Sequence, residues 1–195
     1  MIELELKAVV SDPGACRARL LGAGAAAGFV GLMEDRRFDR GGELLGKDQV
    51  LRVRSYRGTD RTRTKISWKG PVRITDGYKA RDEIELEAAG DSAEALFRAL
   101  GYDLSESIDR RVEYFTFPDG GVVRLEWYPR MDVLVEVEGT PAAIETAIGA
   151  LGIDRAAFTA EALPAFVARY EARTGRRAAT SRAALGTDRP SWDEA

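Results

Sequence analysis

Hydrophobic and charged residues alternate along several short segments of this chain. In residues 1–7, MIELELK, aliphatic side chains alternate with Glu3, Glu5 and Lys7. Because successive side chains of a strand point to opposite faces, the charges share one face and the aliphatics the other. The same alternation recurs at 51–54, 65–69, 81–87, 123–127 and 133–138. One such strand is typical of an antiparallel sheet with a wet face. Here the wet faces hold almost only Arg, Lys and Glu, which bind phosphate or metal.

Capping and turn residues divide the chain into elements. Asp12-Pro13 predicts the start of a helix over 13–28. The remaining pattern predicts strands at 33–40, 49–57, 62–70, 78–88, 108–117, 121–128 and 132–138. It predicts further helices at 91–101, 141–152 and 159–173. Residues 174–195, including Trp192, are polar and aperiodic, so we expect one domain over 1–173 followed by a flexible tail.

This order of elements predicts an α+β fold with an antiparallel sheet. Helices must cover the apolar face of the sheet. A sheet that curls into a closed barrel places the charges inside and the helices outside, and about eight strands leave room for one small ligand. A charged interior needs water, metal or an anion, because unpaired buried charge is too costly.

Composition narrows the chemistry. The chain has 195 residues, enough for one domain with a core, and a net charge of −3, which gives nucleic-acid binding no support. It has one cysteine, and it shows neither a membrane-spanning run nor a signal-peptide pattern, so we expect a cytoplasmic protein without a membrane partner. The absence of histidine excludes imidazole catalysis and His-ligated zinc. Carboxylates with Mg²⁺ or Mn²⁺, together with Lys and Arg, remain, and they indicate phosphoryl transfer.

Short motifs in a fixed order carry a family resemblance. They are ExExK at 3–7, EDRRFD at 34–39, LRVR at 51–54, WKGP at 68–71, RDEIE at 81–85, RVEY at 111–114 and EVE at 136–138. Over residues 3 to about 170 the chain resembles the CYTH family, or triphosphate tunnel metalloenzymes. That family includes class IV adenylyl cyclases and thiamine or inorganic triphosphatases, and the 34–39 segment is similar to the cyclase branch.

The resemblance implies an eight-stranded closed tunnel that binds a triphosphate with a divalent metal. Lys7 is expected to act beside the reacting phosphate, with Glu3 and Glu5 in the catalytic set. The residues expected to hold phosphate oxygens are Arg52, Arg54, Lys65, Lys69, Arg81, Arg111 and Arg124. The residues expected on the metal side are Glu3, Glu5, Glu83, Glu85, Glu126, Glu136 and Glu138.

The chain departs from the family pattern at three positions. Asp109 stands where a lysine is usual, Glu126 where an aspartate is usual and Asp132 where a glycine is usual.

Three functions are compatible with the resemblance. We predict a metal-dependent triphosphatase acting on tripolyphosphate, thiamine triphosphate or a nucleoside triphosphate. The alternatives are a class IV adenylate cyclase and a non-catalytic polyphosphate- or nucleotide-binding module. The partner is thus a small triphosphate, and a homodimer is left open.

Overall fold

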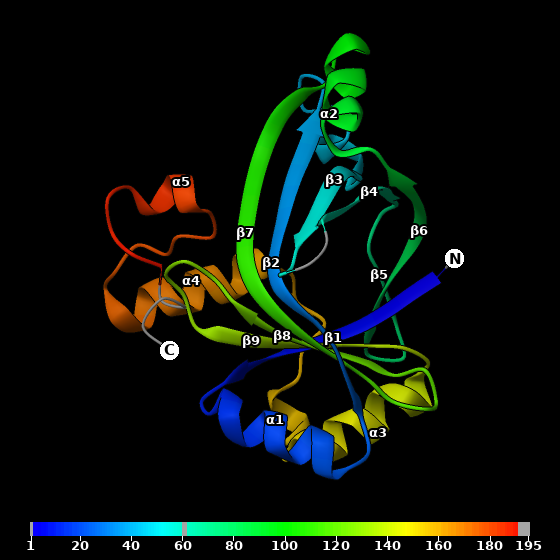
Figure 1. Ribbon diagram of the computed structural model, residues 1–195, viewed down its shortest axis with the longest axis vertical. Helices are drawn as coiled ribbons and strands as arrows, with labels where there is room; N and C mark the ends of the chain where they lie inside the picture. Colours follow the sequence, from blue (N-terminus) through cyan, green and yellow to red (C-terminus); the bar gives the residue numbers. More distant parts are fainter. Residues whose placement is uncertain (1, 60–61, 191–195) are drawn as a thin grey trace.

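The structure, a computed structural model, describes residues 2–59 and 62–190 and has the predicted α+β architecture (Figure 1). Its strands are β1 (Ile2–Val10), β2 (Ala26–Asp39), β3 (Val50–Arg57), β4 (Thr62–Lys69), β5 (Arg73–Thr75), β6 (Tyr78–Ala88), β7 (Asp103–Thr116), β8 (Val122–Trp127) and β9 (Val133–Glu138). Its α-helices are α1 (Pro13–Gly22), α2 (Gly90–Ala99), α3 (Pro141–Leu151), α4 (Leu163–Thr174) and α5 (Arg182–Leu185). Two short 3₁₀ turns are η1 (Leu45–Lys47) and η2 (Arg155–Ala157).

Eight of the strands close into an antiparallel ring. The order around it is β1-β9-β8-β7-β2-β3-β4-β6, and β6 pairs again with β1. The closing register sets Glu3 opposite Arg81 and Glu5 opposite Lys79. The short β5 pairs with β6 outside this ring. The predicted closed eight-stranded sheet is therefore confirmed.

Helices cover the outside of the ring. α1 and α3 lie together beneath β1, β8 and β9 (Figure 1), where Leu20 and Ile144 pack with Leu6 and Val135 in the largest apolar cluster. On the opposite side, α2 contributes Phe97 to a smaller cluster. In these two clusters the apolar contacts lie on the outer face, as the alternation predicts.

The fourth helix closes one end of the barrel. Ile108 and Leu134 share the inner face with the charged residues of β7 and β9, and they pack against Phe166 and Tyr170 of α4. The apolar stripe of this helix is thus core packing. Within the described residues, no helix is long and apolar enough to cross a membrane.

Some element boundaries differ from the prediction. The first helix ends at Gly22 and not near residue 28, because the chain reverses through Gly24, whose φ of 87° is left-handed. β2 then begins at Ala26, seven residues before the expected 33, and β7 begins at Asp103. Both strands are 14 residues long. The added residues 26–32 of β2 include no charged residue, and the added residues 103–107 of β7 are mostly exposed, so neither stretch shows the alternation of apolar and charged residues.

The segment from Gly175 to Pro190 differs more from its prediction, since it packs on the sheet where a flexible tail was expected. Ala179 is fully buried and exchanges backbone hydrogen bonds with Arg130 at 2.8 and 3.0 Å. The backbone N–H of Asp109 donates to the carbonyl of Thr180 at 2.8 Å. Backbone pairing of this kind leaves no hydrophobic periodicity in the sequence, so neither the pattern nor the composition of this segment could reveal that it is ordered. Trp192 lies outside the described residues.

Candidate active site

The inner face of the barrel gathers nearly all the predicted site residues. Residues opposite each other in antiparallel strands point to the same side, so the register fixes the inner set. It comprises Glu3, Glu5, Lys7, Arg52, Arg54, Lys65, Lys69, Arg81, Glu83, Glu85, Arg124, Glu126, Glu136 and Glu138. Arg111 is the exception among the predicted residues.

One side of the interior is a glutamate–lysine wall, formed by Glu3, Glu5 and Lys7 of β1, Lys69 of β4, Lys79 of β6 and Glu138 of β9. Lys69 contacts Glu3, and Lys79 contacts Glu5. The ammonium of Lys7 lies 2.9 Å from Glu5 and also contacts Glu136. Each of these lysines therefore contacts its carboxylate partners through one ammonium group, without a forked, two-point contact.

Three carboxylates of this wall could hold a metal ion. Oxygen atoms of Glu3, Glu5 and Glu138 lie within 4.8 Å of one another. Hard oxygen ligands of this kind suit Mg²⁺ or Mn²⁺. An ion here would take over the carboxylates that Lys69 and Lys79 now contact.

The acids of this wall titrate differently from one another. Burial raises the pKa of Glu138, and the neighbouring Glu3 and Glu5 raise it further against the attraction of Arg124. Burial also opposes ionisation of Glu5, but Lys7 and Lys79 hold its pKa well below the usual range. The negative charge on Glu138 is therefore incompletely compensated, and a cation beside it would relieve this.

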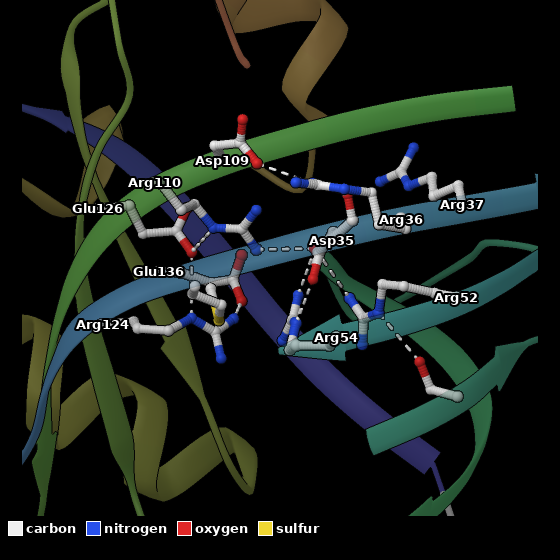
Figure 2. A network of polar contacts seen from close by, with 12 residues as sticks. Asp35, Arg36, Arg37, Arg52, Arg54, Asp109, Arg110, Arg124, Glu126 and Glu136 are labelled. Carbon is white, nitrogen blue, oxygen red and sulfur yellow. Dashed lines mark hydrogen bonds and ion pairs between the residues drawn. The ribbon is translucent and has the colours of Figure 1, made fainter. Parts of the chain in front are cut away.

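The facing side is an arginine wall, in which Arg52, Arg54 and Arg110 surround Asp35 (Figure 2). Arg54 donates twice to Asp35, from Nε at 2.6 Å and Nη2 at 2.8 Å. Arg110 donates from Nη2 at 3.1 Å. Arg52 lies 3.5 Å away and donates its Nε to Ser67 at 3.0 Å. One carboxylate thus orients three guanidinium groups.

The charge balance of the arginine wall favours an ionised Asp35. This residue is 1% exposed, and burial alone would raise its pKa. The three guanidinium groups outweigh burial and hold the pKa well below its usual range. Asp35 neutralises one of these three positive charges, while Arg110 also contacts Glu126 and Arg52 also contacts Glu83. An anion that enters beside Asp35 would meet these guanidinium groups.

Glu126 and Glu136 lie between the two walls and already have cationic partners. Arg110 and Arg124 each donate an Nε to Glu126 at 3.1 Å, and the hydroxyl of Tyr128 donates to its other oxygen at 2.7 Å. These donors outweigh burial and lower the pKa of Glu126 to about 2. Glu136 contacts Lys7 and Arg124. Both were predicted on the metal side, which stays a prediction, and in this structure each contacts basic residues.

Arg111 lies on the outer face, so its expected phosphate contact is corrected. It stacks on Trp127 at 5.1 Å and donates to Glu113 at 3.0 Å. The inward arginine of β7 is its neighbour Arg110. The family pattern was aligned one residue too far along the strand.

The departures at Asp109 and Asp132 also lie away from the barrel interior. Asp109 is on the other side of the strands from Arg54 (Figure 2), where it accepts from Arg36 at 2.7 Å and from the backbone N–H of Arg182 at 2.8 Å. It therefore anchors the C-terminal segment. Asp132 accepts from Arg173 of α4 at 2.5 Å.

The remaining predicted residues lie nearer the rim. Arg81 donates to the carbonyl of Gly70 at 2.5 Å and to the carboxylate of Asp48 at 3.2 Å, so it holds the preceding loops. Lys65 contacts Glu85. Glu83 lies 3.4 Å from Lys69 and 3.6 Å from Arg52, where it joins the two walls.

The inner residues that sequence reasoning missed include Asp35, Ser67, Lys79 and Arg110. Ser67 and Lys79 follow the alternation of their strands and could have been found from it. Asp35 lies in the run Glu34-Asp35-Arg36-Arg37, in which every residue is charged, so periodicity gives no face.

Comparisons with known proteins agree with this fold. No family model matches the sequence, and no curated protein matches it either. Among solved structures, a proposed adenylate cyclase from Vibrio parahaemolyticus superposes with a TM-score of 0.72 at 14% identity, covering 86% of this chain and 98% of the other. The PH1819 protein from Pyrococcus horikoshii gives 0.69 at 20% identity, covering 89% and 99%.

A third structure is HpAC1 from Hippeastrum, a proposed adenylyl cyclase with a dominant triphosphatase activity. It superposes with a TM-score of 0.60 at 17% identity, covering 90% of this chain and 96% of the other. At these identities the likeness establishes the fold. The chain therefore has the fold shared by these proposed adenylate cyclases, as the ordered motifs predict.

Proposed function

We propose that this protein is a divalent-metal-dependent enzyme that hydrolyses a triphosphate bound in the barrel. The observation that carries the proposal is the cluster of Glu3, Glu5 and Glu138, whose oxygens lie within 4.8 Å of one another opposite the arginine wall. The carboxylates can bind a cation, and the arginines can bind phosphate oxygens. Together they suit a triphosphate that is complexed with a metal ion. Pure anion binding would not require the acids.

The residues of the two walls have separate roles. Arg52, Arg54 and Arg110 bind phosphate oxygens, and Asp35 orients them. Glu3, Glu5 and Glu138 hold Mg²⁺ or Mn²⁺, which when bound neutralises charge on the phosphate oxygens. Lys7, which lies between Glu5 and Glu136, would donate a hydrogen bond to the reacting phosphate. Positioning and charge neutralisation supply most of the catalysis in phosphoryl transfer.

A class IV adenylate cyclase is the second candidate, because two of the solved structures above are proposed adenylate cyclases. A cyclase aligns a ribose hydroxyl and releases pyrophosphate, whereas a hydrolase aligns a water and releases orthophosphate. HpAC1 combines a cyclase assignment with a dominant triphosphatase activity, and this favours the hydrolase for the present chain.

A product assay tests the proposal. Purified protein is incubated with tripolyphosphate, thiamine triphosphate or ATP, with Mg²⁺, Mn²⁺ or EDTA. We expect orthophosphate release that EDTA abolishes and either metal restores. Cyclic AMP with pyrophosphate as the main products would replace the hydrolase by the cyclase. Metal-dependent binding without turnover would leave a binding module.

A further inference from the structure

Arg37 of β2 lies next to the arginine wall. It follows Asp35 two residues further along the strand (Figure 2), so the two side chains point to the same face. In the register of β2 and β3, Asp35 lies opposite Arg54 and Arg37 lies opposite Arg52. The register therefore places Arg37 on the inner face, as the neighbour of Arg52 across the two strands.

The guanidinium group of Arg37 is incompletely hydrogen-bonded. Its Nη1 donates to Glu106 of β7 at 2.5 Å. Its Nε is buried and has no hydrogen-bond partner. Among the described residues that are not exposed, no other buried side-chain nitrogen or oxygen lacks a partner. A buried donor without an acceptor is costly, so an oxygen from a ligand or from water is expected at this atom.

The charge of Arg37 acts across the interior of the barrel. Burial lowers the pKa of Arg81, and the charge of Arg37 lowers it further against the attraction of Asp48. Arg81 belongs to β6, which is not a neighbour of β2 in the ring. The two guanidinium groups therefore repel each other through the interior, and an anion between them would relieve this repulsion.

The charge of Arg52 is also incompletely compensated. Burial lowers the pKa of Arg52, and its neighbour Arg54 lowers it further against the attraction of Asp35 and Glu83. These two carboxylates lie 3.5 and 3.6 Å from Arg52. Arg54, in contrast, lies 2.6 Å from Asp35, which outweighs burial and raises the pKa of Arg54 well above its usual value. An anion is therefore favoured most at the side of the wall where Arg37 lies.

We propose that Arg37 is a further phosphate-binding residue of the barrel, whose Nε donates to an oxygen of the bound triphosphate beside Arg52. This contact gives the buried donor its acceptor. Guanidinium N–H groups and phosphate oxygens form strong, charge-assisted hydrogen bonds. The inference rests on the proposed function, because it adds a contact to the same substrate. Arg37 is not among the residues to which the family resemblance assigns a role.

The test separates the Nε donor of Arg37 from its charge. Arg37→Lys keeps the positive charge and removes Nε. In calorimetric titration with tripolyphosphate and Mn²⁺, its dissociation constant should rise about tenfold or more, as expected for one hydrogen bond to a charged group. Arg36→Lys is the matched control, because Arg36 is the adjacent residue but donates to Asp109 on the outer face at 2.7 Å. This control should change the dissociation constant less than about twofold.

A second variant tests whether Arg37 matters only through its ion pair. Glu106→Gln breaks the ion pair and keeps Nε, so the dissociation constant should stay the same or fall. An equal loss of binding in Glu106→Gln and Arg37→Lys would assign the effect to the ion pair and overturn the inference. Circular dichroism and thermal melting establish that the variants fold. If Arg37→Lys does not fold, Arg37→Gln, which also lacks Nε, is titrated in its place.

The outcome for Arg37 is separable from that for the proposed function, because the titration requires no turnover. If the wild-type protein binds tripolyphosphate without hydrolysing any triphosphate, the hydrolase proposal fails, and the dissociation constants still judge Arg37. If the wild-type protein is active and Arg37→Lys binds as tightly, the inference alone is rejected, and water is the partner of Nε. A wild-type protein that does not bind tripolyphosphate would overturn both.

Discussion

The two walls of the barrel use opposite arrangements of charge. In the arginine wall, three guanidinium groups converge on Asp35, and Arg54 makes a forked contact at 2.6 and 2.8 Å. In the glutamate–lysine wall, the carboxylates cluster and each lysine makes point contacts. Forked contacts fix orientation, whereas an ammonium group can change partner with little geometric cost.

The two arrangements suit different ligands within one interior, phosphate at the arginine wall and a metal ion at the glutamate–lysine wall. The arginine wall is oriented before any ligand enters, so it can present guanidinium groups to phosphate without rearrangement. If a metal ion replaced the lysine contacts of the glutamate–lysine wall, as the proposed function requires, the ammonium groups would become available to phosphate.

The largest effect is expected from Asp35→Asn. This change leaves three guanidinium groups beside a neutral amide, and breaking a buried ion pair costs roughly 3–5 kcal/mol of folding stability. Chemical unfolding of the variant and of Asp109→Asn, its neighbour on the outer face, measures this. Equal losses in both variants would show that Asp35 has no special role. KM for the triphosphate should rise in Asp35→Asn alone, because only this variant disorders the phosphate contacts.

Acid titration sharpens the same point. The pKa of Asp35 in the folded protein lies well below its unfolded value of about 3.9. This stabilisation is fully present above the unfolded pKa and is lost as pH falls through the folded pKa. Glu126, whose folded pKa is about 2, adds a loss of the same sign. Unfolding free energy should therefore fall more steeply below pH 4 in wild type than in Asp35→Asn.

The second effect concerns Glu138→Gln on the opposite wall. We expect turnover to fall about 100-fold, since one metal-side carboxylate is lost. The melting temperature should stay unchanged or rise, because burial raises the pKa of Glu138 and its ionised form is therefore disfavoured in the fold. Initial rates and thermal melts on the same samples measure both quantities.

Glu113→Gln is the matched control for Glu138→Gln. The side chain of Glu113 is 5% exposed, against 20% for Glu138, and it lies on the outer face, where Arg17 of α1 donates to both of its oxygens at 2.7 Å. This variant should melt earlier and keep its turnover. If Glu138→Gln instead lost stability and kept activity, Glu138 would be a structural residue.

The sequence predicted most of the glutamate–lysine wall, but in the arginine wall it predicted Arg52 and Arg54 and missed Asp35 and Arg110. Glu3, Glu5 and Glu138 lie in strands with strict alternation, so the inner face follows from period two. β2 and β7 instead carry runs of adjacent charges and register shifts. There, Asp35 was missed and Arg111 was chosen in place of Arg110. Only the pairing of distant strands decides which of two adjacent arginines faces inward.

A pair of alanine variants tests that correction. Arg110→Ala removes an inward guanidinium and should weaken triphosphate binding by about 1.5–3 kcal/mol, the range for hydrogen bonds to charged groups. Arg111→Ala removes the outward guanidinium over Trp127 and should leave binding unchanged. Calorimetric titration with tripolyphosphate and Mn²⁺ compares them. A loss confined to Arg111→Ala would restore the original assignment from the sequence.

The smallest effect is expected from Ser67→Ala, which tests whether the arginine wall must be oriented before the ligand binds. Ser67 is 1% exposed, and its hydroxyl accepts from Nε of Arg52 at 3.0 Å. Ser67→Ala keeps every charge and removes only this acceptor, so triphosphate binding should weaken by about 1 kcal/mol, roughly fivefold. Ser55→Ala removes a hydroxyl that pairs with Thr64 on the outer face of the same two strands, and it should not affect binding. If both serine variants bind like wild type, the ligand itself orients Arg52, and the contrast between a fixed wall and an exchangeable wall does not extend to this residue.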